Sequence, residues 1–220
     1  MFMRLDQFLV SKGFFTTRQK AKEAIKRGFV FVNGVRVTKP SARVSGDAEI
    51  EVRCEERPRG YWKLAEIDAR WKIIDKNDIV LDLGSSAGGF LLYASERAKK
   101  VYGIEFSREF EEELRKIESD RKNVRVFIGD AFTFDTSMLE PLDVILDDLT
   151  LEPSASLKAL SRFLPLLKDG GRVLFVMKEG KNPEFEEYGL EVVDVIDSSE
   201  RREKYFLLIK SCKVPPSASP

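Results

Sequence analysis

Histidine is missing from the sequence altogether, and cysteine occurs only twice among its 220 residues. Without histidine there is no Ser-His triad, no histidine general base and no histidine ligand for zinc. The two cysteines, Cys54 and Cys212, are far apart and form no CxxC pair, so we expect neither a disulfide framework nor a metal site. Any catalysis must therefore use lysine, carboxylates, hydroxyls or a cofactor.

Long apolar runs are also missing. No run approaches the roughly 20 apolar residues that a membrane helix needs. The first residues, Met1–Asp6, lack the charged, apolar and small-residue parts of a signal peptide. We therefore expect a cytoplasmic protein that does not bind membranes. Hydrophobic residues still make up 43% of the chain, enough to bury the core of one large domain or of a small and a medium one.

The net charge of zero hides an uneven distribution along the chain. Residues 1–50 hold ten Lys and Arg against four Asp and Glu, whereas the remaining residues hold 27 against 33. A basic segment followed by an acidic body is typical of a protein whose first part meets a polyanion.

The first 57 residues have the pattern of a small domain. Apolar residues recur at i, i+3 and i+4 at Leu5, Phe8 and Leu9. This spacing predicts a short helix. A second helix is expected to begin at a cap, Thr16 or Thr17, and to end at Gly28. Asn33-Gly34 between β-branched runs then predicts a hairpin, because a type I′ turn needs positive φ at both central residues.

The second predicted helix carries a basic face. Arg18, Lys22 and Lys26 follow one another at i, i+4 and i+8, with Lys20 and Arg27 nearby. Like charges at that spacing repel one another. A phosphate backbone would relieve the repulsion, so the face is a candidate contact for nucleic acid.

Residues 3–41 resemble the S4-type RNA-binding domain. The matching segments are Arg4-Leu5-Asp6, Thr17-Arg18-Gln19-Lys20-Ala21, Ile25-Lys26-Arg27-Gly28 and Val30-Phe31-Val32-Asn33-Gly34. The resemblance implies two short helices and a hairpin that hold structured RNA by its shape and phosphates. The residues that it implies for RNA binding are Arg4, Arg18, Lys20, Lys22, Lys26, Arg27, Asn33 and Arg36.

A second domain is expected over residues 58–213, after a charged linker at 52–60 and before a disordered Pro- and Ser-rich tail at 214–220. Apolar, β-rich runs alternate there with helical patterns such as 108–119 and 154–168, which is βαβ rhythm. Five such runs are followed by two that suit an antiparallel pair: residues 79–83, 101–104, 124–128, 144–146, 173–176, 190–196 and 205–209. The fold class is therefore α/β, with a mostly parallel sheet, preceded by a small α+β domain.

The ends of the first three predicted strands carry glycine or acid. Residues 82–90 contain a glycine turn without the GxGxxG spacing of a dinucleotide site, Glu105 ends the second strand, and Asp130 follows the third. The glycine turn resembles the first motif of S-adenosylmethionine-dependent methyltransferases, which implies a Rossmann-like, seven-stranded domain that binds this cofactor. Acids at the next two strand ends suit its ribose hydroxyls and its adenine amino group. The implied cofactor residues are Asp82, Gly84, Ser85, Ser86, Gly88, Gly89, Phe90, Glu105, Asp130, Ala131 and Asp148.

Four charged residues complete a second resemblance, to FtsJ-type ribosomal RNA 2′-O-methyltransferases. Lys63 lies in an Arg-x-Arg-x-aromatic-aromatic-Lys-Leu segment, Asp148 and Lys178 follow the fourth and fifth strands, and Glu203 lies in a Ser-Ser…Arg-x-Glu segment. Together with the first domain, this is the layout of the TlyA/haemolysin A family. The resemblance implies that these four residues are catalytic and that the substrate is ribosomal RNA, free or in ribosomal subunits.

A ribose 2′-hydroxyl is a weak nucleophile, so a base or a cation near it should help methyl transfer. Lys178 is the candidate to contact that hydroxyl, held by Asp148, with Asp147 as a rival for that role. Lys63 would steer the substrate and Glu203 would orient a lysine. Whether Lys178 removes the proton or only orients the hydroxyl stays open, because a nearby carboxylate favours its charged form.

Three other functions compete with this interpretation. The first is a non-catalytic RNA-binding or ribosome-assembly factor, against which the complete set of four charged residues argues. The second is base methylation, which generally uses an Asn/Asp-Pro-Pro-aromatic segment that is absent after the fourth strand. The third is membrane lysis, for which no amphipathic or apolar segment is suitable.

Overall fold

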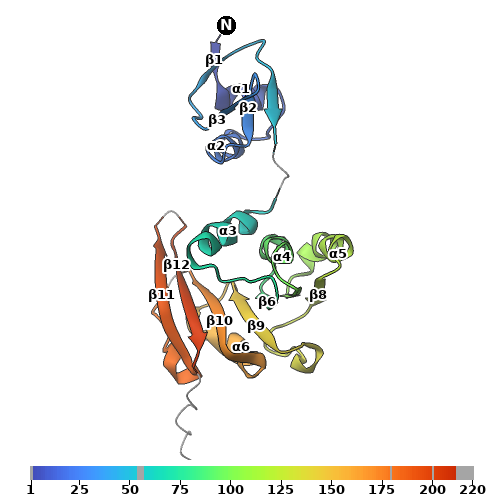
Figure 1. Cartoon of the computed structure of the whole chain (residues 1–220), viewed down its shortest axis with the longest axis vertical. Helices are drawn as coiled ribbons and strands as arrows, with labels where there is room; N and C mark the ends of the chain where they lie inside the picture. The colour runs from blue at the N-terminus through green and yellow to red at the C-terminus, as the bar shows by residue number, and fades with distance from the viewer. Residues whose placement is uncertain (1, 54–56, 179, 200, 212–220) are drawn as a thin grey trace, which may run out of the picture. The chain divides into compact units, whose positions relative to one another are not determined.

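The computed structural model describes residues 2–53, 57–178, 180–199 and 201–211. The chain divides into two compact units, Met1–Arg57 and Pro58–Pro220, which we describe separately (Figure 1). Both cysteines and the tail predicted to be disordered, residues 214–220, lie outside the described residues.

The first unit contains both predicted helices and the predicted hairpin. Its elements are β1 (Phe2–Arg4), α1 (Leu5–Ser11), α2 (Arg18–Lys26), β2 (Val30–Val32), β3 (Val35–Val37), β4 (Arg43–Ser45) and β5 (Ile50–Val52). Thr17 caps α2, since its side chain accepts the backbone N–H of Lys20 at 3.3 Å. Asn33 and Gly34 have φ of 49° and 76°, as the predicted turn requires. β5 adds a third strand to the hairpin in the order β3-β2-β5, and β1 pairs with β4.

The predicted linker is too long at both ends. Val52 pairs with Val30 in the small sheet, and α3 begins at Arg59. The predicted linker therefore overlaps β5 at Val52 and α3 at Arg59 and Gly60, because these residues belong to a strand and a helix.

The second unit is a seven-stranded sheet with helices on both faces (Figure 1). Its strands are β6 (Ile79–Leu83), β7 (Lys100–Glu105), β8 (Val124–Ile128), β9 (Leu142–Asp147), β10 (Leu167–Met177), β11 (Leu190–Ser198) and β12 (Glu203–Lys210). Its helices are α3 (Arg59–Trp71), α4 (Gly89–Ser95), α5 (Glu111–Asp120) and α6 (Pro153–Ser161), with short 3₁₀ turns at Arg108–Phe110, Thr136–Met138, Leu164–Leu166 and Phe185–Tyr188. None of the helices within the described ranges is long and apolar enough to cross a membrane.

One predicted helix is wrong in its extent. The pattern over residues 154–168 predicts a single helix, but α6 ends at Ser161, a 3₁₀ turn follows, and β10 begins at Leu167. Pro165 lies inside that turn, and proline cannot continue the backbone hydrogen bonding of a helix.

Alternate residues of the strands point to opposite faces and build two separate cores. On one face, Val80, Val144 and Leu174 pack with residues of α3, α4 and α5. On the other face, Leu81 and Phe175 belong to the core that includes α6. The expected α/β fold with a mostly parallel seven-stranded sheet is confirmed.

The order β11-β12-β10-β9-β6-β7-β8 places the switch point of the sheet between β6 and β9. Strands β6 to β10 are parallel, so their carboxyl ends share one edge, where open α/β sheets bind ligands. β12 runs antiparallel to β10, with Met177 opposite Lys204, so the start of β12 lies at that same edge. This edge therefore collects five strand ends and the first residues of β12.

Candidate active site

The turn after β6 brings two strand ends together at the switch point. Gly84 has φ of 82°, and a Cβ there would lie 3.3 Å from the carbonyl oxygen of Asp148 and 3.2 Å from Leu149. The backbone N–H of Asp148 donates to the carbonyl of Leu83 at 3.2 Å. Glycine at position 84 thus lets the segment after β9 lie directly against the turn after β6.

The second half of this turn packs against helices. A Cβ on Gly89 would lie 2.5 Å from the backbone nitrogen of Tyr61 in α3, and one on Gly88 would lie 2.1 Å from Ile117 in α5. Phe90 is buried, and its ring centroid is 5.7 Å from Nζ of Lys63. These three predicted cofactor residues therefore fix α4 against its neighbours, and Phe90 also contacts a predicted catalytic residue.

Asp82 is a fully buried carboxylate. Its exposed fraction is 0%, and neither carboxylate oxygen accepts a hydrogen bond from any residue that the structure describes. Burial, together with the nearby carboxylates of Asp148, Glu105 and Asp147, raises the pKa of Asp82 to about 8. A buried acceptor of this kind lacks the partner that folded proteins normally provide, so it fits a bound group that carries donors or positive charge.

Two further predicted cofactor residues hold backbone turns at neighbouring strand ends. Glu105, at the end of β7, accepts the backbone N–H groups of Ser86 and Ser107, each at 2.7 Å. Asp130, after β8, accepts the backbone N–H of Phe132 at 2.8 Å. Each carboxylate is thereby fixed in orientation, and each keeps lone pairs for another donor.

Exposed aromatic side chains follow these two acids and were missed in the sequence. Phe106 comes directly after Glu105 and is 75% exposed, and Phe132 is exposed two residues after Asp130. A large apolar ring in water next to a fixed carboxylate is the combination expected around a flat ligand such as adenine. The signal was present in the sequence as a phenylalanine beside each acidic strand end.

The loop after β8 is held by a residue that no local pattern could reveal. Arg162, at the end of α6, donates to the carbonyls of Ala131 and Phe134 at 2.8 Å and 3.0 Å. Ala131 itself is buried. The guanidinium thus fixes the loop that carries Asp130 from a position about thirty residues later in the chain.

The four predicted catalytic residues form one chain of contacts. Nζ of Lys63 lies 2.8 Å from Oδ2 of Asp148 and 3.0 Å from Oε2 of Glu203. Nζ of Lys178 lies 3.5 Å from Oδ1 of Asp148. Asp148 therefore bridges two lysines, and the order along the chain of contacts is Lys178, Asp148, Lys63, Glu203.

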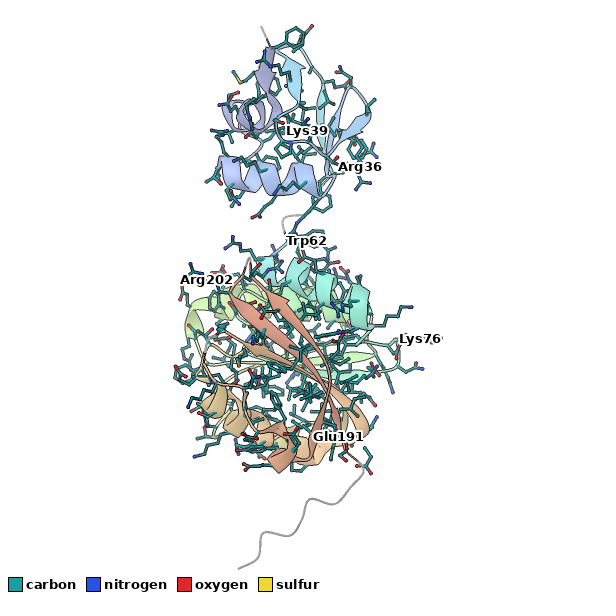
Figure 2. All side chains as sticks on the ribbon, turned by 90° about the vertical axis from the view of Figure 1, so that its left-hand side faces the viewer. Arg36, Lys39, Trp62, Lys76, Glu191 and Arg202 are labelled. Atoms are coloured by element: carbon teal, nitrogen blue, oxygen red, sulfur yellow. The ribbon has the colours of Figure 1, made fainter. Side chains whose placement is uncertain are left out.

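The fold explains why residues so distant in sequence meet. Lys63 lies on the buried face of α3, and its side chain is only 9% exposed. It follows Trp62, which Figure 2 labels. Glu203 begins β12 directly after Arg202, which marks the turn of the β11–β12 hairpin in Figure 2. Because β12 is antiparallel to β10, its first residue, Glu203, lies beside the end of β10, where Lys178 follows. The phenol of Tyr205 donates to Oε2 of Glu203 at 2.8 Å and fixes this carboxylate.

Asp147 and Asp148 are adjacent but serve different neighbours. Asp147 is fully buried and accepts hydrogen bonds from Oγ of Ser156 in α6 at 2.9 Å and 3.0 Å and from the backbone N–H of Leu149 at 3.2 Å. Burial raises the pKa of Asp147 to about 7. Asp148 is the first residue after β9, and it is Asp148 that contacts the two lysines.

Three arginines predicted to bind RNA have partners within the first unit. Arg4 and Arg18 both bond the buried carboxylate of Asp6, at 3.0 Å and 2.9 Å. The hydrogen bond from Arg4, with that from Arg18, lowers the pKa of Asp6 to about 2. Arg36, labelled in Figure 2, donates to the carbonyls of Gly28 and Arg27 at 2.9 Å and 3.1 Å and thereby caps the end of α2.

The other predicted RNA-binding residues lie on α2 and on the hairpin turn. Lys20 and Lys26 are exposed, whereas Lys22 and Arg27 are half-buried. Asn33 accepts the backbone N–H of Glu49 at 2.9 Å, so its side chain joins the turn to the residue just before β5. The basic surface of the helix is therefore carried mainly by its lysines.

Comparison with known proteins identifies both units. The model of the FtsJ-like methyltransferase family matches residues 56–182, and the S4 domain model matches residues 3–50. Hemolysin A of Brachyspira hyodysenteriae is 38% identical over 106 residues, 47% of this chain and 44% of that protein. A fibrillarin-like rRNA/tRNA 2′-O-methyltransferase of Methanospirillum hungatei is 28% identical over 127 residues, 56% of this chain and 61% of that protein.

Solved structures share the fold. Fibrillarin of Aeropyrum pernix, crystallised with S-adenosyl-L-methionine, covers 82% of this chain and 94% of its own with a TM-score of 0.60 and 19% identity. The chain spans about half the length of the curated relatives it matches first. The resemblances to the S4 domain, to FtsJ-type methyltransferases and to the haemolysin A layout are confirmed. The chain belongs to the FtsJ-like methyltransferase family and carries an S4 domain before its methyltransferase domain.

Proposed function

We propose that this protein transfers a methyl group from S-adenosylmethionine to a ribose 2′-hydroxyl of ribosomal RNA. The observation that carries the proposal is the pair of lysines bridged by Asp148 at the switch point of a methyltransferase sheet. Methyl transfer needs an aligned nucleophile and little covalent help from the enzyme. When bound, the cofactor supplies a methyl group activated by a positively charged sulfur. The 2′-oxygen bonds the methyl carbon as the carbon–sulfur bond breaks, S-adenosylhomocysteine leaves, and the hydroxyl proton passes to Lys178 or to water.

The residues at the carboxyl ends of β6, β7 and β8 suit this cofactor. Asp82 offers a buried carboxylate that no described residue bonds, which matches an ammonium group. Glu105, fixed by two backbone N–H groups, keeps lone pairs for ribose hydroxyls. Asp130 and the exposed ring of Phe106 suit the amino group and the flat face of adenine. The predicted cofactor site is therefore supported at three adjacent strand ends.

Lys178 is the residue that we assign to the nucleophile. Its side chain is 33% exposed, whereas that of Lys63 is 9% exposed and lies between two carboxylates. An incoming ribose can thus reach Lys178 more easily than Lys63. At Nζ of Lys178 two roles suit the chemistry: the amine takes the hydroxyl proton, or the ammonium orients the hydroxyl and stabilises its developing charge. Asp148, held by Lys63, keeps Lys178 at the site in both cases.

The RNA part of the proposal rests on the first unit. Lysines on α2 provide positive charge for phosphates, and the S4 domain model matches this unit. Relatives named for ribosomal RNA methylation favour ribosomal RNA as the substrate. An enzyme with this substrate works where ribosomes assemble, which is the cytoplasm in a bacterium or archaeon.

The test is transfer of labelled methyl groups from S-adenosylmethionine to ribosomal RNA from a strain that lacks this protein, followed by digestion to nucleosides. Free RNA and both ribosomal subunits are tried separately. A labelled 2′-O-methyl nucleoside is the expected product. A labelled base would favour base methylation instead. Absence of transfer, with measurable binding of both cofactor and RNA, would favour the ribosome-assembly factor.

A further inference from the structure

Lys178 has two neighbours in the site, and the nearer one is a hydroxyl. Nζ of Lys178 donates to Oγ1 of Thr150 at 2.8 Å, whereas Oδ1 of Asp148 is 3.5 Å away. Thr150 is exposed, and Lys178 is the more exposed of the two lysines bound to Asp148. The shortest hydrogen bond of the Lys178 ammonium group is therefore to a neutral side chain, that of Thr150, on the solvent side of the site.

One oxygen of Asp148 faces Lys178 without accepting a hydrogen bond from it. Oδ2 of Asp148 bonds Lys63 at 2.8 Å, but Oδ1 is shielded from solvent and accepts no hydrogen bond within the described ranges. Lys178 forms only a long ion pair with this oxygen, at 3.5 Å, and a small rotation of its side chain would shorten the contact to a hydrogen bond. The hydroxyl of Thr150, which accepts the shorter contact of 2.8 Å, is placed to keep the ion pair with Asp148 at this longer distance.

The segment that carries Thr150 is fixed to the sheet. The backbone N–H of Asp148 bonds the carbonyl of Leu83, and that of Leu149 bonds Oδ1 of Asp147 at 3.2 Å. Two successive backbone bonds just before Thr150 define where its side chain begins. Its hydroxyl is therefore a fixed acceptor for Lys178, in spite of its exposure.

We propose that Thr150 is a positioning residue whose hydroxyl holds Nζ of Lys178 at the mouth of the site, away from Asp148 and within reach of a ribose hydroxyl. This inference rests on the proposed function, since it assigns Thr150 a role in the same methyl transfer. One hydrogen bond to the hydroxyl leaves two N–H directions of the ammonium for Asp148 and for the substrate. Loss of the hydroxyl lets Lys178 fold back onto Asp148, so the step that slows is the transfer itself and not the binding of either substrate.

Two substitutions of Thr150 distinguish the effect of its hydroxyl from the effect of its side-chain shape. Thr150→Val keeps the branched shape and removes the hydroxyl, whereas Thr150→Ser keeps the hydroxyl and removes the methyl group. We expect Thr150→Val to lower kcat about tenfold, which is the effect of one hydrogen bond to a charged group. The KM values for S-adenosylmethionine and RNA should stay within about twofold, and Thr150→Ser should keep kcat within about threefold of the wild type.

Thr136→Val is the matched control. Thr136 lies in the 3₁₀ turn Thr136–Met138 that precedes β9. The substitution Thr136→Val should leave kcat unchanged. A wild-type kcat in Thr150→Val would overturn the inference, as would a loss in Thr150→Ser equal to that in Thr150→Val. A raised KM for RNA at unchanged kcat would instead make Thr150 an RNA contact and also overturn it. Failure of the proposed function is a separate result, because the wild type would then transfer no methyl group to ribose.

Discussion

Each unit buries an aspartate with no exposed surface, but the hydrogen bonding of the two carboxylates differs. Asp6 in the first unit bonds two arginines, and its pKa is lowered to about 2. Asp82 in the second unit has no hydrogen bond to its carboxylate from the residues described, and burial raises its pKa to about 8. The first carboxylate is satisfied by the fold, whereas the second needs a partner that the fold does not supply.

The difference distinguishes charged residues that stabilise the fold from charged residues that are candidates for binding a ligand. Arg4 and Arg18 were predicted to bind RNA, yet each bonds a carboxylate of its own unit. Asp82 was predicted to bind cofactor, and its environment is consistent with that prediction. A buried charge that is paired inside the protein stabilises it, and one that is left unpaired costs stability and marks a candidate site.

Asp148 combines both situations, because one of its oxygens is bonded by Lys63 and the other accepts no hydrogen bond from the described residues. Its substitution should have the largest effect of the four that follow from this comparison. Asp148→Asn removes the charge that holds both lysines, so kcat should fall about 10²–10³-fold. Asp147→Asn is the matched control, since Asp147 bonds Ser156 and not the lysines. Steady-state methyl transfer measures both variants. Equal losses in the two would contradict the distinction between the adjacent aspartates.

Removal of the paired carboxylate should destabilise the first unit. Asp6→Asn is expected to lower its free energy of unfolding by about 1–2 kcal/mol, a moderate value because both arginines are partly exposed. The pKa of Asp6 is lowered on folding, so this stability is present above about pH 4 and is lost as the pH falls towards 2. Urea unfolding of the full chain measures it, with the exposed Asp47→Asn as control. An unchanged midpoint in Asp6→Asn would show that the pair contributes nothing.

The lysines of α2 should account for RNA affinity, now that the nearby arginines have internal partners. Lys22→Ala combined with Lys26→Ala should weaken RNA binding about tenfold relative to the wild type at a fixed salt concentration. Measured from 50 to 200 mM salt, the slope of log affinity against log salt concentration should become shallower by about 2. At saturating RNA, kcat should not change. Lys12→Ala combined with Lys39→Ala removes the same charge elsewhere in the unit. If this control lowers affinity equally, α2 is not the RNA-binding face.

The unpaired carboxylate should respond to pH in the direction opposite to Asp6. The pKa of Asp82 is raised on folding, so its contribution falls as the pH rises from about 4 to about 8. Asp82→Asn should therefore raise the free energy of unfolding at pH 8 by about 1 kcal/mol and weaken binding of S-adenosylmethionine. Unfolding at pH 5 and pH 8, with calorimetric titration of the cofactor, measures both effects. Tighter cofactor binding in this variant would contradict the site.

Local patterns predicted the elements better than the contacts between them. Runs such as Ile79–Leu83 have the composition of buried strands, and parallel strand ends share an edge, so the meeting of Asp148 and Lys178 follows from the sequence. Glu203 was located by resemblance, and only the antiparallel direction of β12 explains its place. The bonds from Arg162 to the loop after β8 are not predictable, because no local rule connects a side chain to backbone carbonyls about thirty residues away.

The most direct test of the central claim compares the wild type with Lys178→Ala in methyl transfer to ribosomal RNA, with nucleoside analysis of the product and a binding measurement for S-adenosylmethionine. The account predicts a 2′-O-methyl nucleoside from the wild type and a rate about 10²–10⁴-fold lower from the variant, at nearly unchanged cofactor affinity. Wild-type transfer by Lys178→Ala would contradict the assignment of Lys178 to the ribose hydroxyl.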